Sequence, residues 1–205
     1  GNSYDSLSVT IFNPRNSRAF PEHDLPAPMK VGRKLYVMKP ARPGTEPRVL
    51  LDAGVGGIGS PSVTYDGKSI LVSMAFDGDP FFHIYRVPAE GGKPEQLTDG
   101  PFDDFEPTYL PDGGIVFCSS RCNRWVPCYY TQVAVLFRCD ADGQNMRQLS
   151  ANTEQENTPW VLPDGRILYQ RWEYVDRSQV HYHHLWTTNP DGPNPTVYYG
   201  QIGRA

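Results

Sequence analysis

The sequence lacks long apolar runs and an excess of positive charge. None of its apolar segments approaches the ~18 residues that a membrane-spanning helix requires. The 205 residues carry a formal net charge of −4, so the basic footprint of a general nucleic-acid binder is missing. Residues 1–5 show neither the basic nor the apolar part of a signal peptide. We therefore expect no transmembrane segment and no nucleic-acid partner.

The motifs of several enzyme classes are missing as well. The sequence contains no Gly-x-Ser-x-Gly nucleophile elbow and no His-Glu-x-x-His zinc motif. It also contains no Cys-x-x-Cys-His, the attachment motif of c-type haem. The glycine-rich stretch 55–59 is not directly followed by Gly-Lys-Ser or Gly-Lys-Thr, so it lacks the spacing of a phosphate-binding loop. Whether the chain is an enzyme stays open, and no catalytic residue can be assigned.

Cysteine is scarce but clustered. Four cysteines are too few for a disulfide scaffold, yet all lie between residues 118 and 139. Cys122 and Cys128 enclose a short loop and could form a disulfide, bind a metal with a nearby histidine, or stay free thiols. We expect Cys118 and Cys139 to lie in neighbouring strands, chiefly as small buried residues.

Glycine and proline are abundant, and they punctuate a repeat. The chain has 19 glycines and 20 prolines, with 12% aromatic residues, which favours a packed all-β domain of short strands. Asp-Gly turns begin at Asp66, Asp112 and Asp164, 46 and 52 residues apart. Each is followed by an apolar run, an aromatic-centred strand and a Gln-Leu-Thr-like ending. The recurring aromatic residues are Tyr36, Tyr85, Phe137 and Trp186.

A period of about 50 residues predicts the four-stranded antiparallel blades of a β-propeller. We assign 1–31 to an N-terminal segment that forms an atypical or partial blade, and 32–59 to the last two strands of a blade. Residues 60–103, 104–155 and 156–205 each form a further blade. The chain thus holds about 3.5–4 blades, the first without a recognisable first strand pair, and we expect it to be part of a larger or dimer-completed propeller.

The repeat resembles known families. Tyr109-Leu-Pro-Asp-Gly and Val161-Leu-Pro-Asp-Gly, each before an apolar strand, resemble TolB-type, WD40-like repeats. The stretches 96–107, 120–128 and 171–177 resemble the propeller of hydrazine synthase alpha subunit-like proteins. The resemblance implies a propeller in a periplasmic or extracellular setting. That family's namesake is a multihaem enzyme, whose haem chemistry is not carried over because the haem motif is missing here.

Long, chemically rich loops are predicted on one face of the propeller. They are 75–82, 119–133 and 171–183 within blades, and 52–60, 99–106 and 150–158 between blades, whereas the opposite face has short turns. Such an asymmetry marks the long-loop side as the working face. Charged and aromatic side chains there suit a polysaccharide or a partner protein. The candidates are Arg121, Arg124, Trp125, Tyr129, Arg171, Trp172, Tyr174, Asp176, Arg177, His181 and His183.

Metal binding is a further hypothesis. His181 and His183 point to the same side of a strand and could bind zinc with Cys122 and Cys128. His184 aligns with His83, which favours a structural role for both. Acidic residues in the loops between blades could hold calcium, although we favour hydrogen bonding to loop backbone. These residues are Asp99, Asp103, Asp104, Glu106, Glu154 and Glu156.

Two classes of function fit these observations. The first is a binding or scaffold module that presents the loop face to a partner protein or a polysaccharide. The alternative is an enzyme domain, either polysaccharide lyase-like or a subunit of a hydrazine synthase-like redox complex with haem elsewhere. A homodimer or a larger assembly would fit either class.

Overall fold

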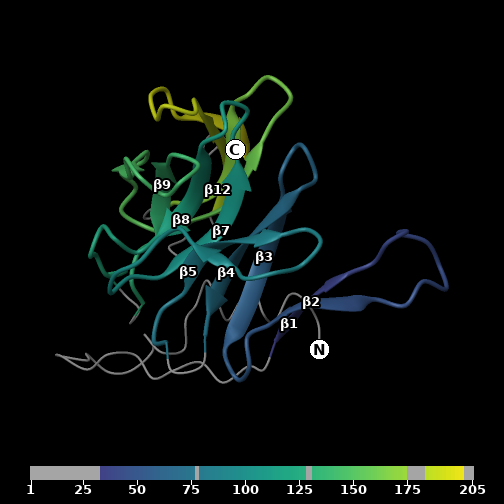
Figure 1. Cartoon of the computed structure of the whole chain (residues 1–205). Coiled ribbons are helices and arrows are strands. Elements are labelled where there is room, and N and C mark those ends of the chain that lie inside the picture. Colours follow the sequence, from purple (N-terminus) through teal and green to yellow (C-terminus); the bar gives the residue numbers. More distant parts are fainter. Residues whose placement is uncertain (1–32, 77–78, 128–130, 175–182, 201–205) are drawn as a thin grey trace.

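The computed structural model describes residues 33–76, 79–127, 131–174 and 183–200 (Figure 1). All regular elements in these ranges are strands, and none of the described residues forms a helix that could cross a membrane. A two-stranded sheet contains β1 (Lys34–Val37) and β2 (Arg48–Asp52). The other strands form three four-stranded sheets. These contain β3 (Gly57–Val63), β4 (Ser69–Ala75), β5 (His83–Pro88) and β6 (Glu95–Gln96); β7 (Asp104–Tyr109), β8 (Ile115–Ser119), β9 (Val135–Cys139) and β10 (Arg147–Gln148); and β11 (Glu156–Val161), β12 (Ile167–Trp172), β13 (His183–Thr188) and β14 (Thr196–Tyr199).

Each four-stranded sheet is an antiparallel meander in chain order. The first strands lie beside one another, with β3 contacting β7 and β7 contacting β11. Neighbouring sheets therefore pack face to face around these inner strands, which is the arrangement of blades in a β-propeller. The prediction of an all-β propeller with four-stranded antiparallel blades is confirmed.

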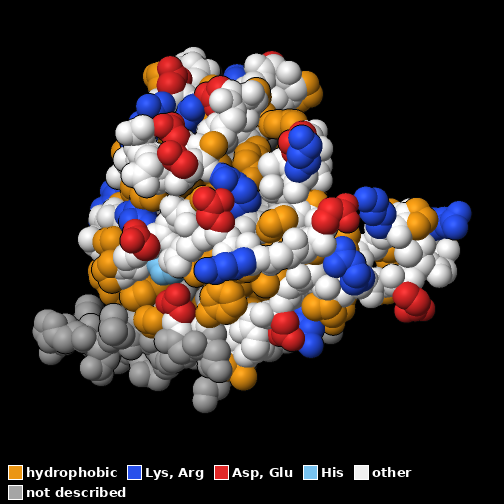
Figure 2. Space-filling model, in the orientation of Figure 1, with side chains coloured by type: hydrophobic (Ala, Val, Ile, Leu, Met, Phe, Trp, Pro, Cys, Tyr) orange, Lys and Arg blue, Asp and Glu red, His pale blue; other side chains and the backbone are white. Residues whose placement is uncertain are grey.

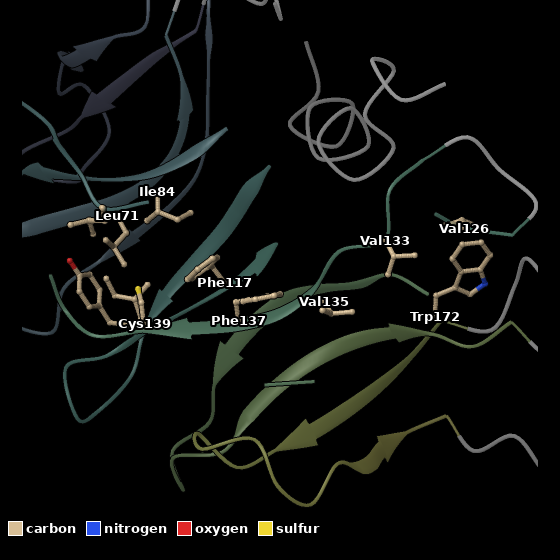
Figure 3. Close-up of a cluster of buried hydrophobic side chains, with 12 residues drawn as sticks. Leu71, Ile84, Phe117, Val126, Val133, Val135, Phe137, Cys139 and Trp172 are labelled. Atoms are coloured by element: carbon tan, nitrogen blue, oxygen red, sulfur yellow. The ribbon is translucent and has the colours of Figure 1, made fainter. Parts of the chain in front are cut away.

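Apolar clusters between the blades form the core. Leu71 and Ile84 of the β3–β6 blade pack against Phe117 and Phe137 of the next blade, together with Leu97. Figure 3 shows this cluster continuing along β9 towards the loops. The Phe117 and Phe137 rings are stacked, with centroids 6.4 Å apart. Because each sheet buries apolar side chains on both faces, one blade cannot form a core without its neighbours.

A bulge recurs in the first strand of each complete blade, at the residue before a proline. Ser60, Glu106 and Thr158 have φ angles of 51°, 54° and 50°, in the left-handed region that these residue types rarely adopt. The strand register shifts at the same places. A bulge re-aims the backbone and side chain of one residue while the strand continues past it.

The recurring Gln-Leu-Thr ending fastens the fourth strand of a blade to the third. The Thr98 hydroxyl accepts a hydrogen bond from the Ile84 N–H at 2.9 Å, and the Ser150 hydroxyl accepts one from the Leu136 N–H at the same distance. The leucine of the motif lies between blades. Leu97 is covered by the turn that contains Gly143, and the turn that contains Gly192 covers the corresponding leucine, Leu149.

Replacement of Gly143 by alanine tests this contact between blades. A Cβ at this position would overlap the Leu97 carbonyl oxygen, and the φ of 83° is itself unfavourable for alanine. We expect Gly143→Ala to lower the free energy of unfolding by about 2–5 kcal/mol, from backbone strain plus overpacking. The measurement is urea denaturation.

Gly113→Ala is the matched control, because Gly113 has a φ of 87° and a Cβ at that position would meet no atom within 4 Å. It should lose only the strain component, about 1–2 kcal/mol. Equal losses in the two variants would show that the Gly143 turn does not press against the preceding blade.

Candidate functional site

In the loop between β8 and β9, the described segments 120–127 and 131–134 pair as the two arms of a hairpin on the predicted working face. Trp125 and Gln132 form a β-bridge, and the Val133 N–H donates to the Arg124 carbonyl at 2.7 Å. Val126 and Val133 are buried beneath this hairpin, next to Trp172 (Figure 3). The hairpin therefore has its own apolar base, while Trp125 is exposed.

The loop between β10 and β11 fastens this hairpin from the side. The Arg124 guanidinium donates to the Asn152 carbonyl at 2.5 Å. The Gln155 side chain donates to the Gln132 carbonyl at 2.7 Å and accepts from the Ala134 N–H at 2.8 Å. Both loops thus lie on the same side of the propeller, and one holds the other in place.

Arg121 anchors the start of the same loop. Its guanidinium donates through Nε and Nη2 to the two carboxylate oxygens of Asp104, at 3.1 and 2.7 Å. The Ser119 hydroxyl donates to the same carboxylate at 2.6 Å, and Asp104 is completely buried. The guanidinium also lies over the Phe102 ring, 5.0 Å from its centroid. These partners hold Arg121 in a bidentate, largely desolvated ion pair, so its main role is to position the loop.

The other described candidates form an aromatic group at the end of β12. Trp172 is buried and stacks on His183, with centroids 5.5 Å apart and planes 11° apart, and meets the Tyr174 ring edge-on at 5.9 Å. The Arg171 guanidinium lies 4.5 Å above the Trp186 ring. The structure thus brings Trp172, Tyr174 and His183 together with the β8–β9 hairpin, whereas Arg121 belongs to a separate ion pair.

Several predicted site residues lie outside the described residues: Tyr129, Asp176, Arg177, His181 and Cys128. Cys122 Sγ lies 3.2 Å from the Val133 carbonyl oxygen, and its disulfide with Cys128 stays a prediction. Within the described ranges, no group of three or more His, Cys, Asp or Glu side chains could hold a metal ion. The zinc and calcium hypotheses stay predictions.

The placement of three acidic residues in loops was wrong. Asp104 and Glu106 lie in β7, and Glu156 lies in β11, all buried. The inner strand begins before the bulge and continues past it, so the residues ahead of each proline belong to the strand and not to the loop. Their side chains accept hydrogen bonds inside the propeller, as Glu156 does from the Leu136 N–H at 3.3 Å.

Glu106 connects three blades. Its N–H donates to the Ser73 hydroxyl of the preceding blade at 3.0 Å. Its carboxylate accepts from the Thr158 N–H of the following blade at 2.5 Å, and the Cys118 thiol lies 3.8 Å from the same oxygen. Burial raises the pKa of Glu106 above its ordinary value of 4.5. This role was not predicted from the sequence, and the signal available was an acidic residue at the recurring position before proline.

The two buried cysteines of the β7–β10 blade lie on opposite faces of the sheet. Cys118 packs towards the β11–β14 blade, and Cys139 packs towards the β3–β6 blade. Burial raises the pKa of the Cys118 thiol well above its ordinary value and that of Cys139 to about 12. Both thiols are therefore inert packing groups at neutral pH.

A second concave surface lies among the short turns. A cleft of about 530 Å³ is lined by Tyr65, Pro111, Trp160 and the turn 161–163. Tyr65 and Trp160 are highly exposed, and the Tyr65 hydroxyl donates to the Tyr109 carbonyl at 3.3 Å. No function was predicted for these turns from the sequence, although aromatic residues beside Asp-Gly turns could have pointed to the cleft.

The blades and their loop face define a β-propeller, and solved structures of this class are similar to the chain. A TolB-type protein from Agrobacterium tumefaciens is 20% identical, with a TM-score of 0.60, over 75% of this chain and 52% of that chain. Hydrazine synthase from Kuenenia stuttgartiensis is 16% identical, with a TM-score of 0.67, over 78% and 27%. A nidogen/laminin complex is 15% identical, with a TM-score of 0.60, over 81% and 58%.

These similarities establish the fold alone. The chain spans less than two thirds of the length of each of these structures. No family model and no curated protein matches the sequence.

The raised pKa of Glu106 predicts a pH dependence of stability. The folded chain holds this proton to a higher pH than the unfolded chain does, so the stability linked to Glu106 is fully present below the unfolded pKa. It is lost as the pH rises through the folded pKa. We expect Glu106→Gln to make the free energy of unfolding fall less steeply as the pH rises above about 4.5, measured by urea denaturation at each pH.

Glu46→Gln serves as the control because Glu46 is exposed. It should keep the pH dependence of the wild type. If Glu106→Gln also kept the pH dependence of the wild type, burial would not raise the pKa of Glu106 in the folded chain. The buried Glu156, whose pKa is raised by desolvation as well, should leave a residual slope in the Glu106 variant.

Proposed function

We propose that the chain is a binding module that docks a partner protein on its loop face. The observation that carries the proposal is the fastened hairpin between β8 and β9, which presents Trp125 with 43% of its surface exposed. Trp125 lies between Asn123 and Pro127, which are also exposed. The centre of the proposed surface is therefore an aromatic ring on a rigid support.

Such a surface is suited to binding for two physical reasons. The hairpin is already held by Arg124 and Gln155, so little backbone freedom would be lost when a partner binds. Tryptophan buries a large apolar area with few rotatable bonds and is over-represented among the residues that dominate binding energy. The partially exposed aromatic group around Tyr174 and His183 extends the surface beyond the hairpin.

The similar structures support this proposal by analogy of fold. One of them is a complex between nidogen and laminin, in which a propeller fold occurs in a protein assembly. The resemblance to TolB-type propellers supports a periplasmic or extracellular location as part of the same proposal. A polysaccharide ligand and the enzyme alternatives are outcomes of the experiment that follows.

The proposal is tested by comparing partner capture by two variants. Tagged wild-type chain, Trp125→Ala and Trp160→Ala are cross-linked in the extracytoplasmic fraction of the source cells, and bound proteins are quantified by mass spectrometry. Trp160 is the control because it is exposed among the short turns. We expect one protein to be recovered with wild type and Trp160→Ala and reduced about tenfold with Trp125→Ala, the loss typical of a central aromatic contact.

The same protein preparations test the alternatives. The binding proposal would be overturned in favour of a lyase by two results together. No recovered protein would depend on Trp125, and the wild type would cleave polyuronates. Elemental analysis of the purified chain tests the zinc and calcium predictions, with about one equivalent of either metal as the supporting result.

A further inference from the structure

The same contact recurs between successive blades. At the first strand pair and at the last blade, only one half of this contact is present. A leucine lies in the fourth strand of a blade or directly after it, and the next blade covers it with the glycine of its turn between third and fourth strands. Leu50, Leu97 and Leu149 are covered in this way by Gly91, Gly143 and Gly192. All three leucines are equally buried, each with 8% of its surface exposed.

The last blade breaks this rule. In the repeat, Tyr198 of β14 takes the position of Leu149, and it is 54% exposed. Leu185, opposite Tyr199 on the neighbouring strand, is exposed as well. The outer part of this blade therefore has an apolar surface of the kind that the next blade covers elsewhere in the chain.

The first strand pair has the matching half of the contact. The aromatic residue of each third strand packs against the preceding blade, and Tyr85 and Phe137 are 5% and 7% exposed. The equivalent residue of β1, Tyr36, is 53% exposed, beside the exposed Val49. A Cβ on Gly44, in the turn 38–47, would meet no atom within 4 Å, unlike one on Gly143.

A polar contact repeats in the same way. Arg138 is held by Asp112 at 2.6 Å and donates at 2.9 Å to the Pro190 carbonyl, in the turn that carries Gly192. Arg86 donates likewise to the Ala141 carbonyl in the turn of Gly143. In the last blade a threonine replaces this arginine.

The last blade nevertheless has a guanidinium beside this threonine, contributed by the residue directly before β12. Arg166 is bound to Asp164 and donates to the Thr187 hydroxyl at 3.2 Å. Thr187 takes the place of Arg138, and Arg166 that of Gly114, which lies against the Arg138 side chain. The last blade thus keeps both the carboxylate and the guanidinium of the contact, with further N–H donors available for a turn carbonyl.

We propose that the β1–β2 hairpin of a second copy of this chain docks on the outer part of the β11–β14 blade. Tyr36 and the turn 38–47 of one copy would cover Tyr198 and Leu185 of the other, and Arg166 would donate to a carbonyl of that turn. The two surfaces are the two halves of the contact that recurs three times within the chain. Figure 1 shows the hairpin projecting from the body, and Figure 2 shows hydrophobic and basic side chains on it.

This contact is heterologous, because the surface that docks differs from the surface that receives. That property gives a sharp test by mixing variants. Tyr36→Asp and Tyr198→Asp each damage one half of the contact and should each shift the equilibrium towards a monomer of about 23.1 kDa. When the two variants are mixed, the intact hairpin of one can dock on the intact receiving blade of the other, so association should be restored.

The measurement is sedimentation equilibrium, with circular dichroism to verify that each variant is folded. We expect the wild type to associate, each single variant to weaken association about tenfold or more, and the mixture to recover it. Tyr65→Asp, exposed in a different region, is the control and should associate like the wild type. A monomeric wild type would overturn the proposal and assign the surface to another protein or to further blades, and so would a mixture that stays monomeric.

Discussion

The bulge at Glu106 is the constraint on which the arrangement of the blades depends. The left-handed backbone there directs the N–H to Ser73 in one blade and the carboxylate to Thr158 in another. A buried carboxylate without such donors would be costly, so the bonds are favourable only when all three blades are in place. Ser60 and Thr158 adopt the same backbone conformation, which makes the bulge a property of the repeat. The inner strands are thus tied together by polar contacts, while apolar clusters fill the space between the sheets.

The loop face follows from this packing. Because β7 continues through the bulge, Asp104 is buried at its start and can hold Arg121 at the base of the β8–β9 loop. The loop before β11 reaches sideways to the same hairpin through Gln155. Neighbouring blades therefore fix the position of Trp125, although no regular strand contains it. The same rule of contact between neighbours explains why Tyr36 and Tyr198 are exposed at positions whose equivalents in the other blades are buried.

The sequence predicted the repeated parts of this structure well and the unique parts poorly. The spacing of Tyr85 and Phe137 placed the third strands, because identical environments select similar residues at each repeat. The division into residue ranges stays a prediction, since the described sheets do not test where one repeat ends. Glu106 was placed at the end of the loop 99–106, whereas β7 already begins at Asp104, and only the backbone shows the bulge. The candidate list on the loop face could not separate the buried Trp172 from the exposed Trp125, because burial there depends on contacts with the neighbouring loop.

Hydrogen exchange at the Thr158 amide tests the central claim most directly. If the Glu106 carboxylate ties three blades together, this amide should exchange only through global unfolding, with the same free energy as amides in the middle of β8 and β9. The Lys68 amide, which bonds to Asp66 in an exposed turn, is the reference for fast exchange. Exchange at Thr158 as fast as at Lys68 would contradict the account, because the contact between the inner strands would then open while the blades stay folded.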